Sequence, residues 1–104
     1  MERKKLRLIY NPYAGKRRLI PQLDTAIRIF QDGGYAVSVH RTKSPVDIEY
    51  SASQSGDVDC VVIAGGDGSV HQCVNGLMKI TSENRPVLGI LPVGTANDLA
   101  YGLG

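Results

Sequence analysis

The sequence predicts an α/β fold in which helices flank both faces of a parallel sheet. Apolar or β-rich segments alternate with segments whose apolar residues recur at helical spacing. The segment Asp59 to Ala64 is continuously apolar after its first residue, which is typical of a parallel strand covered on both faces. With 104 residues, of which 42% are hydrophobic and 21% charged, the chain suits one globular domain with a single core.

The first strand is predicted over Lys5 to Tyr10. It opens into the loop Asn11-Pro12-Tyr13-Ala14-Gly15, because proline and glycine stop the strand. The first helix follows, and Gly33-Gly34 supplies its C-terminal stop. Its apolar face consists of residues at helical spacing, which are Leu19, Ile20, Leu23, Ala26, Ile27 and Phe30.

A second strand is predicted over Tyr35 to Thr42. Its residues alternate, with Val37 and Val39 on one face, which places it nearer the edge of the sheet. Ser44-Pro45-Val46-Asp47 then has the pattern of a capping box with proline at the first helical position. This pattern predicts a short helix that runs to about Ser55.

The third strand, Asp59 to Ala64, is predicted to be central. The helix after it is expected to allow close packing at Asn75-Gly76 and to bury an apolar stripe made of Val70, Cys73, Val74, Leu77 and Met78. Pro86 to Leu91 is predicted as a fourth strand, which turns at residues 92–94 into another helix start at residues 95–98. This order implies right-handed crossovers. Because the chain stops at Gly104, scarcely two turns into that helix, we expect it to be part of a larger protein.

Charge is distributed unevenly along the chain, although the net charge is only +2. Residues 1–43 hold ten Lys or Arg against three acids, whereas residues 44–104 hold two against seven. A basic N-terminal half suits ATP phosphates or an anionic membrane surface, with solvated charges that bind nothing as the alternative.

Cys60 and Cys73 lie among apolar residues, so both are expected to be buried thiols in a reducing compartment, without a disulfide. Neither has zinc-ligand spacing with His40 or His71. The sequence contains no stretch long and apolar enough for a membrane span, and its N-terminus lacks the apolar region of a secretory signal. A cytoplasmic location is therefore expected.

The polar loops that follow strands one, three and four are expected to meet at the carboxyl edge of the sheet, where ligands bind in such folds. In the second of them, Gly65-Gly66-Asp67-Gly68-Ser69, glycines let the backbone approach an anionic ligand and free amides at the helix start point towards it. A carboxylate such as that of Asp67 is energetically unfavourable beside phosphates unless a metal ion, a sugar hydroxyl or a protonated partner interacts with it. A simple helix cap is the alternative interpretation of Asp67.

Three familiar motifs do not fit the spacing. The residue five before Gly15 is Tyr10, which excludes the phosphate loop G-x-x-x-x-G-K-[ST]. His71 stands where G-x-G-x-x-G needs its last glycine and where G-x-S-x-G around Ser69 needs its second.

Asn11-Pro12-Tyr13-Ala14-Gly15, Gly65-Gly66-Asp67-Gly68-Ser69 and Leu91-Pro92-Val93-Gly94-Thr95-Ala96-Asn97-Asp98 together resemble the diacylglycerol kinase catalytic domain family, which includes bacterial lipid kinases, sphingosine kinases and ceramide kinases. The resemblance covers nearly the whole chain. It implies a three-layer Rossmann-like sheet, related to that of NAD kinase, in which residues 1–104 form the N-terminal part that binds ATP with Mg²⁺. It also implies that a C-terminal β-rich domain, absent from this chain, supplies most of the lipid pocket and the general base.

Carried over to this sequence, the resemblance implies a role for each motif residue. Asp67 would act in the magnesium-linked, acidic part of the site, and Asn97 and Asp98 would hold the shape of the cleft. No metal ligand is assigned with confidence within these residues. The residues that would contact ATP are Asn11, Pro12, Tyr13, Ala14, Gly15, Thr42, Gly65, Gly66, Gly68, Ser69, Val70, His71, Gln72, Gly94 and Thr95.

The glycine loop departs from the commonest family pattern in three places. Ser69 replaces threonine, His71 replaces asparagine and Gln72 replaces glutamate. Ser69 keeps the hydroxyl, so the loss of a methyl group should matter little. Gln72 puts in doubt any role that needs a carboxylate there. A simple capping box at Thr95 and Asp98 remains the alternative to a nucleotide contact.

The function implied is that of an ATP-dependent kinase acting on a lipid hydroxyl, of diacylglycerol or a related lipid, and the chain alone is expected to have little or no kinase activity. Peripheral contact with an anionic membrane at its inner face is expected, nucleic acid is not, and a homodimer is left open. An NAD kinase, which shares the Gly-Gly-Asp-Gly loop, and a non-catalytic nucleotide-binding module are the alternatives.

Overall fold

A computed structural model describes residues 3–12 and 19–92 of the chain. Its elements are β1 (Lys4–Tyr10), α1 (Leu19–Asp32), β2 (Tyr35–Arg41), α2 (Pro45–Ser53), β3 (Cys60–Gly65), α3 (Asp67–Leu77) and β4 (Val87–Pro92). Each strand and helix predicted within these residues is confirmed, with small shifts of the boundaries. The helix predicted from Thr95 lies outside the described residues.

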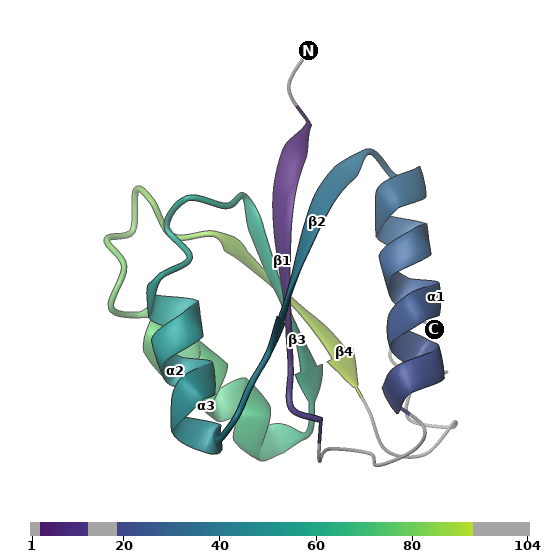
Figure 1. Ribbon diagram of the computed structural model, residues 1–104. Helices are drawn as coiled ribbons and strands as arrows, with labels where there is room; N and C mark the ends of the chain where they lie inside the picture. Colours follow the sequence, from purple (N-terminus) through teal and green to yellow (C-terminus); the bar gives the residue numbers. More distant parts are fainter. Residues whose placement is uncertain (1–2, 13–18, 93–104) are drawn as a thin grey trace.

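The four strands form one parallel sheet in the order β2-β1-β3-β4 (Figure 1). As predicted, β3 is an interior strand and β2 is an edge strand. From β1 the chain moves to β2 on one side, and from there it returns past β1 to β3 and then β4. Since parallel crossovers are right-handed, this reversal places α1 on one face and both other helices on the opposite face.

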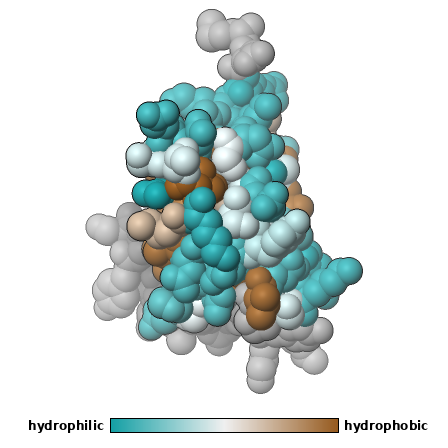
Figure 2. Space-filling model, turned by 90° about the vertical axis from the view of Figure 1, so that its left-hand side faces the viewer, coloured by the Kyte–Doolittle hydropathy of each residue, from teal (hydrophilic) through white to brown (hydrophobic). Residues whose placement is uncertain are grey.

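The described helices therefore form a layer on each face of the sheet, with α1 on one side and α2 beside α3 on the other (Figure 1). The predicted three-layer α/β arrangement is confirmed. Viewed from the side of α2 and α3, the surface is mainly hydrophilic, and its hydrophobic residues form small separate groups (Figure 2).

Instead of the single core predicted, alternating side chains of β1 and β3 supply two core clusters, one on each face of the sheet. On the α1 face, the buried residues are Leu6, Leu8, Leu23, Val62 and Ala64. On the opposite face they are Ile9, Ile48, Ala52, Val61, Ile63, Cys73 and Leu77. Because β3 is covered on both faces, its almost unbroken apolar sequence is explained.

Helices α2 and α3 approach each other most closely at Gly76. A Cβ atom on this glycine would lie 2.7 Å from Cβ of Ala52 and would overlap the carbonyl oxygen of Glu49. The close packing predicted at Asn75-Gly76 is confirmed, because the absence of a side chain at Gly76 brings the backbones into contact.

The buried stripe predicted for α3 is wrong at two positions. Val74 is 38% exposed and Met78 is 62% exposed, and Met78 follows the end of the helix. The helix instead buries Ser69, Cys73, Gly76 and Leu77. The contact at Gly76 turns this side of α3 towards α2, so small residues replace larger apolar ones in the interface.

The capping box predicted at the start of α2 does not form, because its two characteristic hydrogen bonds are absent between the described residues 44 and 47. Ser44 is the N-cap residue and proline follows it, but the Ser44 side chain makes no capping hydrogen bond. The Asp47 carboxylate accepts a hydrogen bond from the backbone N–H of Lys43, at 2.9 Å, one residue before the position that a capping box requires.

One of the two cysteines is more exposed than predicted. Cys60 is only half-buried at the start of β3, whereas Cys73 is fully buried. Both cysteines are free thiols.

Helix α1 ends at the glycine pair, as predicted. The N–H of Gly33 donates to the carbonyl oxygen of Ile29 at 3.0 Å, and Gly34 has a φ of +96°. Only glycine adopts such a backbone conformation without strain, so the second glycine reverses the chain into β2.

Among the described residues, no helix has the length and hydropathy needed to cross a membrane.

Candidate functional site

The carboxyl ends of all four strands lie at one edge of the sheet, which is the lower edge in Figure 1. Tyr10 is in register with both Arg41 and Ala64, and Gly65 is in register with Pro92. The segments that leave β1, β3 and β4 therefore start side by side, as predicted. This edge contains the point between β1 and β3 where the chain direction across the sheet reverses, which is where open α/β sheets bind ligands.

Helix α3 begins directly at this edge. Gly66 is its N-cap residue, and the first intrahelical bond runs from the N–H of Val70 to the carbonyl oxygen of Gly66, at 3.0 Å. The amides of Asp67, Gly68 and Ser69 consequently have no acceptor within the helix, and glycine cannot cap them with a side chain. Three backbone donors and the positive end of the helix dipole therefore coincide here, an arrangement that favours an anion such as phosphate.

The three glycines of this loop differ in whether a side chain would fit at their positions. A Cβ atom on Gly65 would lie only 2.6 Å from both Cβ and Oγ of Ser69, so close packing excludes a side chain there. At Gly66 and Gly68 a Cβ atom would meet no other atom within 4 Å among the described residues. Packing within the described residues does not explain these two glycines, whereas access of a ligand to the backbone would explain them.

Asp67 is the first residue of α3 and is exposed. Because Gly66 holds the N-cap position, the alternative interpretation of Asp67 as the cap is wrong. One exposed carboxylate beside three amides fits a phosphate group that carries Mg²⁺, since this ion usually binds one or two carboxylates together with phosphate oxygens. In the described part of the chain, no three His, Cys, Asp or Glu residues form a metal-binding group.

The residues that follow in α3 point in different directions. Ser69 is buried beneath Gly65, and Val70 packs against the core on the α2 side. His71 is exposed, and its Nε2 lies 3.3 Å from Nδ2 of Asn75, one turn further along the helix. Gln72 is half-buried. The side chain of Val70 therefore faces the core and is poorly placed to contact a ligand. The predicted nucleotide contacts of Ser69, Val70, His71 and Gln72 stay predictions.

Thr42 lies at the same edge, directly after β2, and is 1% exposed. Its backbone N–H and its hydroxyl both donate to the carbonyl oxygen of Tyr10, at 2.9 and 3.1 Å. These bonds join the end of β1 to the end of β2 just before Asn11 and Pro12, which are half-buried. Whether Thr42 contacts a nucleotide stays a prediction.

The remaining predicted site residues fall outside the described ranges. They are Tyr13, Ala14 and Gly15 in the first loop, and Gly94, Thr95, Asn97 and Asp98 after β4. Sequence reasoning also gave no site role to Asp47, which lies near Thr42 through its contact with Lys43. The capping-box pattern at residues 44–47 could have drawn attention to Asp47. That pattern predicts a carboxylate at this position, but it does not predict that the carboxylate binds the amide of Lys43.

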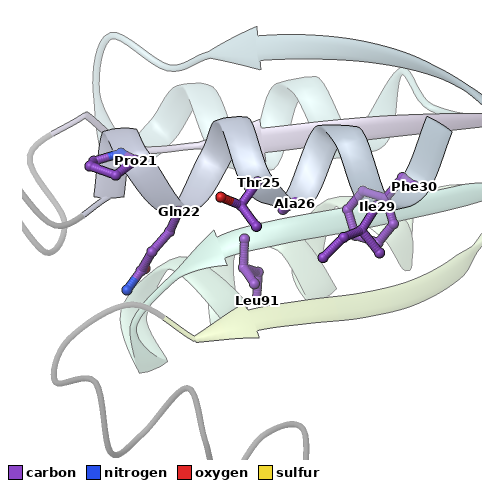
Figure 3. A pocket seen from close by; sticks show the side chains of 7 residues that line it. All are labelled: Pro21, Gln22, Thr25, Ala26, Ile29, Phe30 and Leu91. Carbon is purple, nitrogen blue, oxygen red and sulfur yellow. The ribbon is translucent and has the colours of Figure 1, made fainter. Parts of the chain in front are cut away.

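A separate groove of about 360 Å³ lies between α1 and the end of β4 (Figure 3). Apolar side chains dominate its lining, among them Ala26, Ile29, Phe30 and Leu91. Gln22 also lines it, and its buried Oε1 has no hydrogen-bond partner among the residues that the structure describes. Among the described lining residues, Gln22 and Thr25 are the polar ones and none is charged, so the glycine-loop edge is the better candidate site for a phosphate.

Known proteins that are similar to this chain include diacylglycerol kinases. The profile of the family described as "Diacylglycerol kinase catalytic domain" matches residues 5–104. A diacylglycerol kinase of Bacillus subtilis is 39% identical over 103 residues, which span 97% of this chain and 33% of the relative. A diacylglycerol kinase of Staphylococcus aureus is 36% identical over the same length, with 97% and 32% covered.

Solved structures give the same result. A structure from Bacillus anthracis, provisionally described as a diacylglycerol kinase, superposes with a TM-score of 0.77 and is 33% identical, with 94% of this chain and 33% of that chain covered. A crystal structure of a diacylglycerol kinase from the same organism has a TM-score of 0.66 and 31% identity, with 94% and 36% covered. The chain thus spans about one third of the length of these proteins.

Proposed function

The chain belongs to the diacylglycerol kinase catalytic domain family, and from this premise we propose that it forms the ATP-binding part of a kinase that transfers the γ-phosphoryl group to a lipid hydroxyl. The observation that carries the proposal is the start of α3. The amides of Asp67, Gly68 and Ser69 have no acceptor within α3, and they lie at the edge where β1, β3 and β4 end.

In this proposal the backbone of the glycine loop holds the phosphates of ATP. Phosphoryl transfer depends mainly on positioning and on neutralising charge, and amides at a helix N-terminus supply both without moving. Bound Mg²⁺ would neutralise further charge on the phosphates. Asp67, the acid in the first turn of α3, would hold that ion, which would also account for an acid in a phosphate site.

The acceptor is proposed to be diacylglycerol or a related lipid. Its pocket and the general base for its hydroxyl would come from residues outside this chain, which matches one third of the length of its relatives. The 104 residues alone should therefore bind nucleotide and show little or no kinase activity.

Contact with an anionic membrane is proposed from the charge of the first 43 residues, which carry ten Lys or Arg against three acids. Sedimentation with vesicles tests it. We expect binding to vesicles rich in anionic lipid, loss of binding in high salt, and no binding to zwitterionic vesicles. Equal binding to both kinds of vesicle would contradict this part of the proposal.

The kinase proposal is tested with radiolabelled ATP, a panel of lipids and a protein that also contains the region its relatives have beyond these residues. Asp67→Ala should lower kcat at least about 100-fold, as loss of a group that stabilises transition-state charge does. Asp57→Ala is the matched control, because Asp57 is another exposed acid, and in the described part of the chain it pairs only with Arg7, at 3.5 Å. Full activity of the Asp67→Ala variant would refute its assigned role.

The Gly-Gly-Asp-Gly loop also supports one rival, an NAD kinase, because that enzyme class shares it. The same assay with NAD as acceptor separates the two. Phosphorylation of NAD without any lipid product would establish the rival. If neither acceptor is phosphorylated while ATP still binds, the non-catalytic nucleotide-binding module becomes the better interpretation.

A further inference from the structure

We propose that Asp47 is a positioning residue for the nucleotide site, because its carboxylate fastens the turn that holds Thr42 at the carboxyl edge. The inference rests on the proposed function to the extent that Thr42 is taken to face a nucleotide. It concerns a residue that lies outside all three sequence motifs.

Thr42 occupies the junction between β1 and β2. Its two hydrogen bonds to the carbonyl oxygen of Tyr10 place it beside Asn11, where the first loop begins. A shift of Thr42 would break both bonds and leave the part-buried carbonyl group of Tyr10 without these donors, which is unfavourable. The position of Thr42 therefore affects the shape of the edge at which the first loop starts.

Asp47 contacts one residue on each side of Thr42, through the backbone of Lys43 and the side chain of His40. Its Oδ2 accepts a hydrogen bond from the N–H of Lys43 at 2.9 Å, and the same oxygen lies 3.4 Å from Nε2 of His40. One carboxylate oxygen thus bridges the residue after Thr42 and the residue two before it. The turn from β2 into α2 is fixed by these contacts, since the Ser44 side chain makes no capping bond.

The bond to Lys43 is the stronger of the two contacts. A hydrogen bond to an ionised carboxylate at 2.9 Å is charge-assisted, and this bond is also the main cause that lowers the pKa of Asp47. The contact with His40 is longer, and the two side chains are 40% and 24% exposed, so solvent weakens it. We therefore expect the hydrogen bond to position Thr42 and the histidine to contribute less.

A second role of Asp47 has to be separated from this one. The residue is an acid in the first turn of α2, where it stabilises the helix through the dipole whatever it binds. The double variant Ser44→Asp with Asp47→Ala restores a negative charge at the start of α2 without restoring the bond to Lys43. It should recover the stability of the helix but not the position of Thr42.

The test combines two measurements on the 104-residue chain with variants Asp47→Ala, Asp47→Asn, His40→Gln and the double variant, and with Asp57→Ala as control. Hydrogen exchange of the Thr42 amide reports its bond to Tyr10 directly and needs no nucleotide. Titration with MgATP reports the site. Global unfolding is measured for each variant, so that local opening is distinguished from loss of stability.

For Asp47→Ala we expect exchange of the Thr42 amide to accelerate, and the Kd for MgATP to rise, each about tenfold. Asparagine retains an acceptor, so Asp47→Asn should be intermediate, and His40→Gln and Asp57→Ala should stay within about twofold of the original chain. The double variant should behave like Asp47→Ala.

Unchanged Thr42 exchange in Asp47→Ala would overturn the inference, and so would full recovery by the double variant. If the original chain does not bind MgATP at all, the proposed function fails, whereas the exchange measurement still decides whether Asp47 holds Thr42. The two failures are therefore distinguishable.

Discussion

Gly65 packs directly against Ser69, and a Cβ atom on Gly65 would come within 2.6 Å of both Cβ and Oγ of that serine. The contact fixes the angle at which β3 passes into α3 and hence the direction of the amides at the start of the helix. Ser69 cannot avoid it by a rotamer change, because its Cβ is attached to the helix backbone.

Gly65→Ala should therefore destabilise the chain by about 1–3 kcal/mol, the range for overpacking of a well-packed site. Chemical denaturation of the variant measures this. A variant as stable as the original chain would show that the strand-to-helix junction can relax, and would weaken the claim that it is preorganised.

Gly68→Ala should have the opposite effect on stability. No atom lies within 4 Å of its added Cβ among the described residues, and alanine is favoured over glycine inside a helix by about 0.5–1 kcal/mol. If phosphates approach this backbone, the same methyl group should weaken MgATP binding. A titration alongside the unfolding measurement should thus find a more stable chain that binds less tightly, and unchanged affinity would argue against phosphate at this position.

Gly76→Ala should destabilise the chain because α2 and α3 would have to separate. The added Cβ would overlap the carbonyl oxygen of Glu49 and approach Cβ of Ala52 to 2.7 Å, and a loss of about 1–3 kcal/mol is expected from thermal or chemical unfolding. Gly56→Ala is the matched control, since its Cβ would meet only Ile80, at an ordinary contact distance of 3.8 Å. Equal effects of the two substitutions would contradict the packing described here.

The Cys73 thiol should make stability depend on pH in the alkaline range. Burial raises the pKa of Cys73 from its ordinary value of 9.0 to about 11. Because the folded pKa lies above the unfolded one, this contribution is fully present below pH 9.0 and is lost as pH rises towards about 11. The stability difference between the original chain and Cys73→Ala should shrink over that interval, and a constant difference would mean that the thiol titrates normally.

The strands and helices could be predicted from sequence because their periodic patterns are strong. Continuous apolar residues identified β3 as an interior strand, and Gly33-Gly34 marked the end of α1. Hydrophobic periodicity failed in α3, where Val74 was expected to be buried and is 38% exposed. The interface there depends on Gly76, and a glycine contributes nothing to a hydrophobic stripe even though its backbone contact decides which side faces α2.

The edge that holds the candidate site was also predictable, since parallel strands end on the same side of a sheet. The contacts within it were not. Thr42 bonds to Tyr10, 32 positions away, and only the register of β1 and β2 brings them together. The capping-box pattern likewise gave the position of Asp47 but not its partner, because amides at neighbouring positions compete for one carboxylate.

The central claim is that backbone amides at the start of α3 hold the phosphates of ATP, and titration of the 104-residue chain with MgATP, followed residue by residue through its backbone amide resonances, tests it most directly. The account predicts that the largest shifts occur at Gly66, Asp67, Gly68 and Ser69, while Asp57 and Asp59 at the other end of β3 hardly change. Saturable binding whose largest shifts lie along the α1 groove, at Thr25 and Ile29, would contradict it, as would no binding at all.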